Sequence, residues 1–331
     1  MLIPVTLRAL SEDSPGPKWA EVAREYWPRY RAWFVREGEA KRATFLACER
    51  ALRRHMPEMV PLYEQLVDAA GGSDLVARFL SMYRPPTYAT GCSQGVWRQW
   101  PPLLVRNYDY SQILWERLVW RTRWLGRTVI GNSDCLWGLV DGINDAGLAI
   151  SLAFGGRRVV GDGFGIPLLV RYALQVCTTT AEAVEVLSRV PCHMAYTVTV
   201  LDAEARHATV FLSPDRAPVV TADTVATNHQ GTVEWPEHAL STGSVERLIA
   251  LDRAANAATA TADGLVAQFL EAPVWSGRHG AGAGTLYTAC YSPMDRSLAM
   301  IWPDRRWLQS IAAFDEGTFD VALIRREGAA D

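Results

Sequence analysis

The spacing of hydrophobic positions divides the chain near residue 85. Ahead of that point, apolar residues recur at the three- and four-residue intervals of amphipathic helices. The first such set is Trp19, Val22, Ala23, Tyr26 and Tyr30. Segments 43–56 and 73–83 continue this period, and Ser73 stands where a helix N-cap is expected. The pattern therefore predicts that the first quarter of the chain is all helical.

From Tyr88 to Phe154 the pattern changes to short alternating or apolar runs, which are typical of strands. Turn-forming residues interrupt these runs at 100–102 (WPP), 131–134 (GNSD) and 144–147 (NDAG). This part of the chain is therefore predicted to be a β-meander, with hairpins or loops at the three interruptions.

Helices and strands then alternate in blocks. Residues 165–177 and 180–190 predict two helices, the second with Thr179 and Glu182 at the spacing of a capping box. The remaining predicted elements are strands at 196–202, 207–213 and 217–228, helices near 243–256 and 262–270, and a hairpin over 285–302. Separate blocks of helices and antiparallel strands predict an α+β fold with helices packed outside one or two sheets.

Composition excludes several classes of protein. The 331 residues are 49% hydrophobic, and the net charge of -3 comes without a long run of one sign, so neither a nucleic-acid partner nor a membrane surface is expected. The N-terminus lacks the pattern of a secretory signal, and the six cysteines form no CxxC pair. Reduced thiols in a cytoplasmic protein are therefore expected.

Cofactor and metal motifs are weak. The glycine-rich stretches 161–165 and 277–285 lack the spacing of nucleotide-binding loops and are interpreted as turns. Histidines and cysteines do not occur at the spacing of a zinc site. We therefore expect no cofactor and no metal.

Cys92 is the candidate for chemistry. A small buried core residue is the simpler interpretation of a strand cysteine. Its neighbours favour a nucleophile: Gly91 leaves the preceding carbonyl unshielded, Arg106 can stabilise a thiolate, and Asp109 can hold an ammonium group. Arg106 and Asp109 are three residues apart, so a bulge or a strand end would be needed to aim both at one site.

Five segments in the same order resemble the cysteine N-terminal-nucleophile hydrolases, over about residues 85–305. The resemblance is strongest to the isopenicillin N acyltransferase branch and more distant to the choloylglycine hydrolases. The segments are Cys92 itself, RNYDY at 106–110, VDGINDAGLAISLAF at 140–154, ATNHQ at 226–230 and STGSVER at 241–247.

The resemblance implies a four-layer αββα sandwich with a helical N-terminal pro-segment. It also implies self-cleavage of the Gly91–Cys92 bond, which would give a small chain of residues 1–91 and a catalytic chain of residues 92–331 that stay associated. Cleavage makes chemical sense, because an N-terminal cysteine carries an α-amine with a pKa of roughly 8 beside its own thiol. One residue would then supply both nucleophile and base.

The resemblance also implies a role for each site residue. Cys92 would form a thioester with the acyl group, Arg106 would favour the thiolate, and Asp109 would orient the new amine. Asn228 would donate its side-chain amide to the oxyanion, and Arg247 would complete the polar network. Choloylglycine hydrolases carry a further asparagine where this chain has Phe154 or a glycine, so a backbone N–H of Gly155–Gly156 becomes the candidate for the second oxyanion donor.

The expected substrate is a small-molecule linear amide or acyl thioester. Hydrolysis and transfer to an amine acceptor share the same acyl-enzyme, and the sequence leaves both open, together with a homo-oligomeric state. The alternative from another class is an unprocessed scaffold of the same fold that binds a small molecule without turnover.

Overall fold

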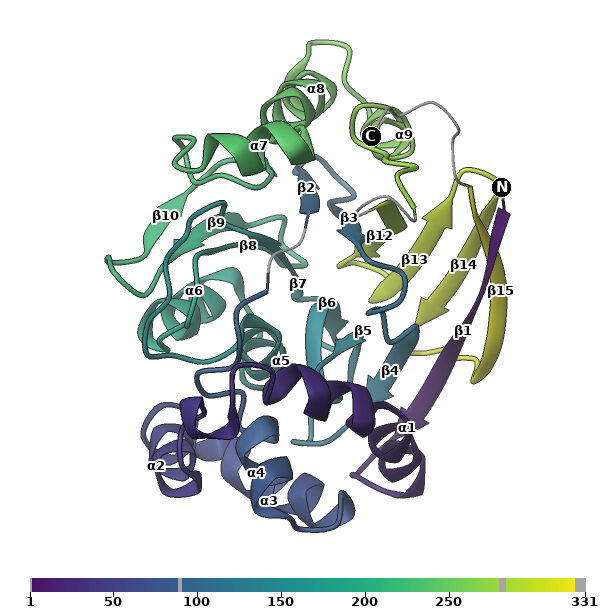
Figure 1. Cartoon of the computed structure of the whole chain (residues 1–331). Coiled ribbons are helices and arrows are strands. Elements are labelled where there is room, and N and C mark those ends of the chain that lie inside the picture. The colour runs from purple at the N-terminus through teal and green to yellow at the C-terminus, as the bar shows by residue number, and fades with distance from the viewer. Residues whose placement is uncertain (1, 89–90, 280–283, 325–331) are drawn as a thin grey trace.

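The computed structural model describes residues 2–88, 91–279 and 284–324, and their strands form two sheets (Figure 1). The larger sheet has nine strands in the order β10-β9-β8-β7-β6-β5-β4-β1-β15. Their bounds are β1 Leu2–Glu12, β4 Leu118–Thr122, β5 Val129–Asp134, β6 Gly138–Asn144, β7 Ala149–Phe154, β8 Tyr196–Leu201, β9 His207–Leu212, β10 Val219–Thr221 and β15 Gly317–Ile324. Neighbouring strands run antiparallel except for β1 and β4, which are parallel.

The smaller sheet has six strands in the order β11-β2-β3-β12-β13-β14, and all its neighbours are antiparallel. Their bounds are β2 Gly91–Trp97, β3 Leu103–Tyr110, β11 Val225–Ala226, β12 Gly284–Ser292, β13 Ser297–Trp302 and β14 Arg305–Ser310. Strands β2 and β3 face β7 and β8 of the larger sheet. The two sheets therefore pack face to face.

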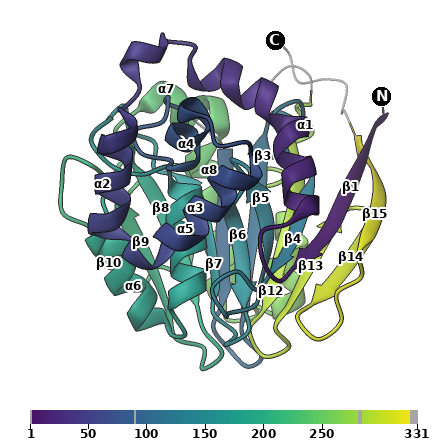
Figure 2. The ribbon, with the colours of Figure 1, turned by 90° about the horizontal axis from the view of Figure 1, so that it is seen from below.

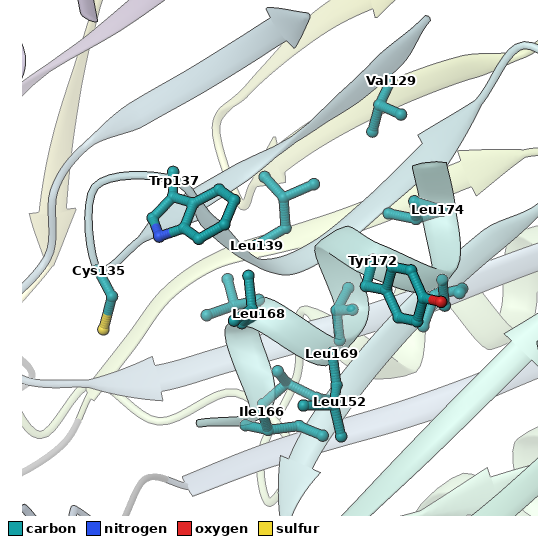
Figure 3. Packing of buried hydrophobic residues seen from close by; sticks show 14 of the residues in the cluster. Val129, Cys135, Trp137, Leu139, Leu152, Ile166, Leu168, Leu169, Tyr172 and Leu174 are labelled. Carbon is teal, nitrogen blue, oxygen red and sulfur yellow. The ribbon is translucent and has the colours of Figure 1, made fainter. Parts of the chain in front are cut away.

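Helices cover both outer faces of this pair. On the larger sheet lie α5 (Ile166–Val176) and α6 (Thr180–Arg189); on the smaller sheet lie α8 (Ser244–Asn256), preceded by α7 (Pro236–Thr242), and α9 (Ala262–Phe269). Figure 3 shows how α5 contributes to the core, with Leu168 and Leu169 beside Leu139 and Leu152 of the sheet. The predicted α+β fold and its four αββα layers are confirmed.

The prediction that the N-terminal segment is all helical is wrong, because this segment begins with a strand. It contains α1 (Pro17–Phe34), α2 (Phe45–His55), α3 (Val60–Ala69) and α4 (Asp74–Leu80), which lie together across one end of the molecule (Figure 2). Ahead of them, however, Leu2–Glu12 forms β1, which is inserted between β4 and β15. Val5, Leu7 and Ala9 are buried on one side of this strand, as its alternating pattern requires.

Other local predictions had mixed outcomes. The caps at Ser73 and Thr179 are confirmed, because their hydroxyls accept hydrogen bonds from the backbone of Val76 and Glu182. The loop predicted at 131–134 is wrong, since these residues belong to β5 and the chain turns after them. No helix in the described ranges is long and apolar enough to cross a membrane.

A pair of carboxyl groups, the buried Glu116 and the half-buried Asp134, joins the N-terminal helices to the larger sheet. The hydroxyl of Tyr30 on α1 lies within hydrogen-bond distance of Glu116 Oε1, and 3.1 Å from Asp134 Oδ1. The hydroxyl has one hydrogen, so one of these two contacts needs a proton on a carboxyl group. Burial, and then the charge of Glu116, raise the pKa of Asp134 to about 7. The pair therefore holds one proton near neutral pH.

This pair should make the protein less stable as pH rises. The native state keeps a proton that Asp134, with an ordinary pKa of 3.8, loses in the unfolded chain. The free energy of unfolding should therefore fall as pH rises from about 4 to about 7. Asp134→Asn should flatten this dependence, and urea unfolding at several pH values checks it. Equal slopes for the two proteins would contradict the prediction.

Candidate active site

Cys92 is the second residue of β2, and its side chain is fully buried between the two sheets. The strand pairs with β3 in a regular register that sets Gly91 opposite Asp109 and Cys92 opposite Tyr108. Because side chains alternate along a strand, the thiol shares the inner face with Gln94, which hydrogen-bonds across to Ser151 of β7. The intervening Ser93 points to the outer face, toward α8.

The Cys92 thiol meets a guanidinium group. Arg106 lies on the same inner face, and its Nη2 is 3.1 Å from Sγ. Its Nε donates to the carbonyl of Leu152 on β7, at 2.9 Å, which fixes the plane of the group. Burial by itself lowers the pKa of Arg106, but the anionic forms of Cys92 and Asp141 outweigh it and raise the pKa well above its usual value. Arg106 is therefore a permanent positive charge beside the thiol.

The backbone of Cys92 is held by two other side chains. Its N–H donates to Asn228 Oδ1 at 3.0 Å, and its carbonyl accepts from Arg247 Nη1 at 2.8 Å. Arg247 Nη2 also donates to Asn228 Oδ1 at 2.8 Å, which locks the two side chains together. Sγ, N and O of Cys92 are thus each contacted by a residue that the sequence analysis proposed for the site.

Asp109 lies on the outer face, opposite to the thiol. Its Oδ2 is 3.3 Å from Arg247 Nη1, and its Oδ1 accepts a hydrogen bond of 2.7 Å from Thr285. Burial raises the pKa of Asp109, and Arg247 and Thr285 offset part of that rise. Neither a bulge in β3 nor the end of the strand turns Arg106 and Asp109 to one side, which aiming both at one face would require. They stay on opposite faces and flank Cys92 from both sides of the strand.

Gly91 provides space beside the proposed cleavage point. A Cβ atom at this position would lie 3.1 Å from the Asp109 Cβ and 3.4 Å from its Oδ2. A larger residue would therefore displace the carboxylate that faces the Gly91–Cys92 bond.

One of the two backbone N–H groups proposed as second oxyanion donor, that of Gly155, has another partner. The Gly155 N–H donates to the carbonyl of Ala195 at 2.8 Å. Phe154, one residue earlier, accepts from Asn228 Nδ2 at 3.0 Å. Gly156 has a φ of +68°, and a Cβ there would lie 2.0 Å from the Asn228 carbonyl oxygen. This turn therefore positions Asn228 closely, and the Gly155 N–H is already used.

The sequence analysis missed one buried residue of the site, Asp141 on β6. Its Oδ2 is 2.5 Å from Arg106 Nη1 and accepts from the Tyr287 hydroxyl at 2.9 Å. Its Oδ1 accepts from Asn132 Nδ2 at 2.6 Å and from the Tyr291 hydroxyl. An aspartate in the middle of a fully buried strand was the available signal, because such a charge needs several partners.

Aromatic side chains continue from the thiol toward the N-terminal helices. The Arg106 guanidinium lies 4.6 Å from the ring centre of Tyr108, which stacks on Tyr110 at 5.5 Å. Tyr110 lines a small cavity of about 50 Å³ with Trp33 of α1 and Tyr88. A larger groove of about 510 Å³ lies beside α8 and has none of the five proposed site residues in its lining. The lining of the small cavity likewise contains none of these five residues, and the stacked pair Tyr108 and Tyr110 connects it to the site.

Comparison with known proteins identifies related sequences and folds. Residues 97–307, more than half of the chain, match the family model described as acyl-coenzyme A:6-aminopenicillanic acid acyl-transferase. A search of curated proteins finds no match. Penicillin V acylase from Agrobacterium tumefaciens is 14% identical with a TM-score of 0.47, over 67% of this chain and 86% of that one. The Caenorhabditis elegans ortholog of N-acylethanolamine-hydrolyzing acid amidase is 16% identical with a TM-score of 0.44, over 70% and 100%.

Proposed function

Since the chain belongs to the acyl-coenzyme A:6-aminopenicillanic acid acyl-transferase family, we propose that it is an acyl-transferring or amide-hydrolysing enzyme whose nucleophile is the thiol of Cys92. The observation that carries the proposal is the set of contacts around this one residue. Arg106 meets its sulfur, Asn228 its nitrogen and Arg247 its carbonyl oxygen.

We further propose that the Gly91–Cys92 bond is cleaved by the protein itself. The Cys92 thiol would attack the Gly91 carbonyl, and the Gly91–Cys92 C–N bond would break as the thiol proton passes to the Cys92 nitrogen. Water would then hydrolyse the resulting thioester between Gly91 and the Cys92 sulfur, which leaves a Gly91 carboxylate and a chain that begins with Cys92. The Asp109 carboxylate lies opposite Gly91 in the strand register and would hold the new α-ammonium group. The Asn228 Oδ1 that now accepts from the Cys92 N–H would accept from this amine as well.

In the proposed reaction the free α-amine takes the thiol proton, and the sulfur attacks the carbonyl of an amide or acyl thioester. Asn228 Nδ2 would donate to the developing oxyanion, an interaction typically worth about 3 kcal/mol. The leaving amine or thiol takes the proton from the α-ammonium group, and a thioester on Cys92 remains. Water or an amine acceptor then removes the acyl group. No cofactor takes part in this scheme.

The two chains should remain together after cleavage. β1 belongs to the N-terminal segment, yet it pairs with β15 along eight positions and with β4 along five. Both neighbours come from the proposed catalytic chain, and Val5 and Leu7 are buried against it. Removing this strand would open the nine-stranded sheet, so we propose that the small chain is a permanent part of the fold.

A labelling experiment tests the reaction. The protein should release p-nitroaniline from an acyl p-nitroanilide and carry the acyl group on Cys92, which peptide mass mapping locates. With increasing amine at fixed pH, growing amide product indicates transfer, and product that does not respond to amine indicates hydrolysis. An adduct on Cys135 or Cys192 would refute the site. A protein that stays uncleaved and forms no adduct with the acyl donor would favour the unprocessed binding scaffold.

A further inference from the structure

Asp141 and Arg106 form an ion pair with no exposure to solvent directly behind the thiol. Both side chains are fully buried, and the two closest atoms are 2.5 Å apart. Two donors contact each carboxylate oxygen of Asp141, namely Arg106 and Tyr287 on one, and Asn132 and Tyr291 on the other. Four donors are the full complement of an ionised carboxylate. Asp141 is therefore held as an anion.

The buried charges around Cys92 cancel in pairs. On the inner face Arg106 is balanced by Asp141, and on the outer face Arg247 is balanced by Asp109. Tyr108 on β3 and Tyr287 and Tyr291 on β12 also face this region, and burial raises the pKa of each hydroxyl well above 10, so they are neutral. Among the described residues, the two arginines that contact Cys92 and their aspartate partners therefore sum to zero charge.

A thiolate at Cys92 would disturb this balance. It would add a third charge to the Arg106–Asp141 pair and leave the buried inner face with a net negative charge, which is costly where water is excluded. A neutral thiol accepts the same contact from Arg106 Nη2 without that cost. Arg106 alone would favour the thiolate, but Asp141 cancels its effect.

We propose that Asp141 is a positioning residue that holds Arg106 against the thiol and neutralises the guanidinium charge. Cys92 then stays protonated until cleavage adds a positive charge beside the thiol. The second half of this inference rests on the proposed cleavage of Gly91–Cys92. An amide nitrogen carries no charge, whereas the α-amine that replaces it can be protonated next to the thiol. Cleavage would thus convert a neutral site into one in which a thiolate is balanced.

The test is the pH dependence of Cys92 alkylation by iodoacetamide. The readout is the midpoint, which is the pH at which the alkylation rate is half of its maximum. Burial slows the alkylation of this thiol by the same factor at every pH and therefore leaves the midpoint unchanged. Intact mass separates label on the uncleaved chain from label on the cleaved chain in one sample, at early times when both are present. If the protein never cleaves itself, the proposed cleavage is wrong. The midpoint of the uncleaved chain still tests the role of Asp141.

Asp141→Asn should lower the midpoint by one pH unit or more in either form, which is about a tenfold faster reaction at pH 7. Tyr287→Phe removes one donor from the carboxylate but leaves its charge in place, so its midpoint should stay at or above that of the wild type. Asp202→Asn is the matched control, because Asp202 is also buried and paired with an arginine, Arg206, but at the end of β8.

A midpoint of Asp141→Asn that equals or exceeds that of the wild type would overturn the role of Asp141, and so would a midpoint of Tyr287→Phe lowered as far as that of Asp141→Asn. In the wild type, the cleaved chain should have the lower midpoint of the two forms. Equal midpoints in the uncleaved and cleaved chains would overturn the change of charge on cleavage. A melting curve for each variant separates these results from partial unfolding.

Discussion

Cys92→Ala is expected to remain a single chain of 331 residues, whereas the wild type should separate under denaturing conditions into chains of 91 and 240 residues. Alanine cannot attack the Gly91 carbonyl, and no other group takes its place on the inner face of β2. Turnover of an activated acyl donor should fall by about 10⁴-fold or more, as for other enzymes that lose their nucleophile. Intact mass and p-nitroaniline release measure the two effects.

Cys177→Ala provides the control for loss of a buried thiol. Cys177 caps the C-terminal end of α5, far along the chain from β2, and burial raises the pKa of its thiol to about 12. This variant should cleave and turn over at the wild-type rate. Fragments of 91 and 240 residues from Cys92→Ala would show that something other than Cys92 cuts the chain, and would contradict self-cleavage.

The nine-stranded sheet shows where reading the sequence succeeded and where it failed. Strands β6 to β9 are joined by short connections or by the helical pair α5 and α6, and their local patterns were sufficient. β1 has an equally regular alternation, but its partners lie at Leu118 and, at the other end of the chain, near Ile324. Pairing over such separations leaves no local mark, so a short strand before four helices was interpreted as part of a helical segment.

The segment 131–134 failed for a different reason. Its Gly, Asn, Ser and Asp are the residues of turns, but in the fold the first three are buried and Asp134 is half-buried. Gly131 is needed for close packing, since a Cβ there would lie 2.6 Å from the Asp141 carbonyl oxygen. Asn132 donates to the Asp141 carboxylate. Tertiary contacts therefore override the turn preference of these residues.

Contacts between site residues that are close in the sequence could be predicted, and contacts between distant segments could not. Cys92 and Arg106 lie on one hairpin, so charge and spacing alone suggested their contact. Asn228 and Arg247 follow Cys92 by 136 and 155 residues and were proposed only through the resemblance to a family. Asp141 reaches Arg106 across the space between two sheets, and that contact depends on how the sheets pack. A pattern along one chain carries no information of that kind.

Gly156→Ala is expected to reduce kcat/KM by about 10²-fold through a residue that touches no reacting atom. The new Cβ would lie 2.0 Å from the Asn228 carbonyl oxygen, so one of the two backbones has to move. Asn228 is the residue that receives the Cys92 N–H, and a shift of about 1 Å in a catalytic group is enough for such a loss. The positive φ at Gly156 adds about 1–2 kcal/mol of strain to any larger residue.

Gly231→Ala separates displacement of Asn228 from backbone strain. Gly231 also has a positive φ, +74°, but a Cβ there would have no atom within 4 Å. Its alanine variant should lose a comparable amount of stability from strain and keep its kcat/KM within about threefold, because nothing is pushed toward Cys92. Melting curves and kcat/KM for the same acyl donor compare the two variants. Equal kcat/KM in both would mean that the contact between Gly156 and Asn228 does not position the site.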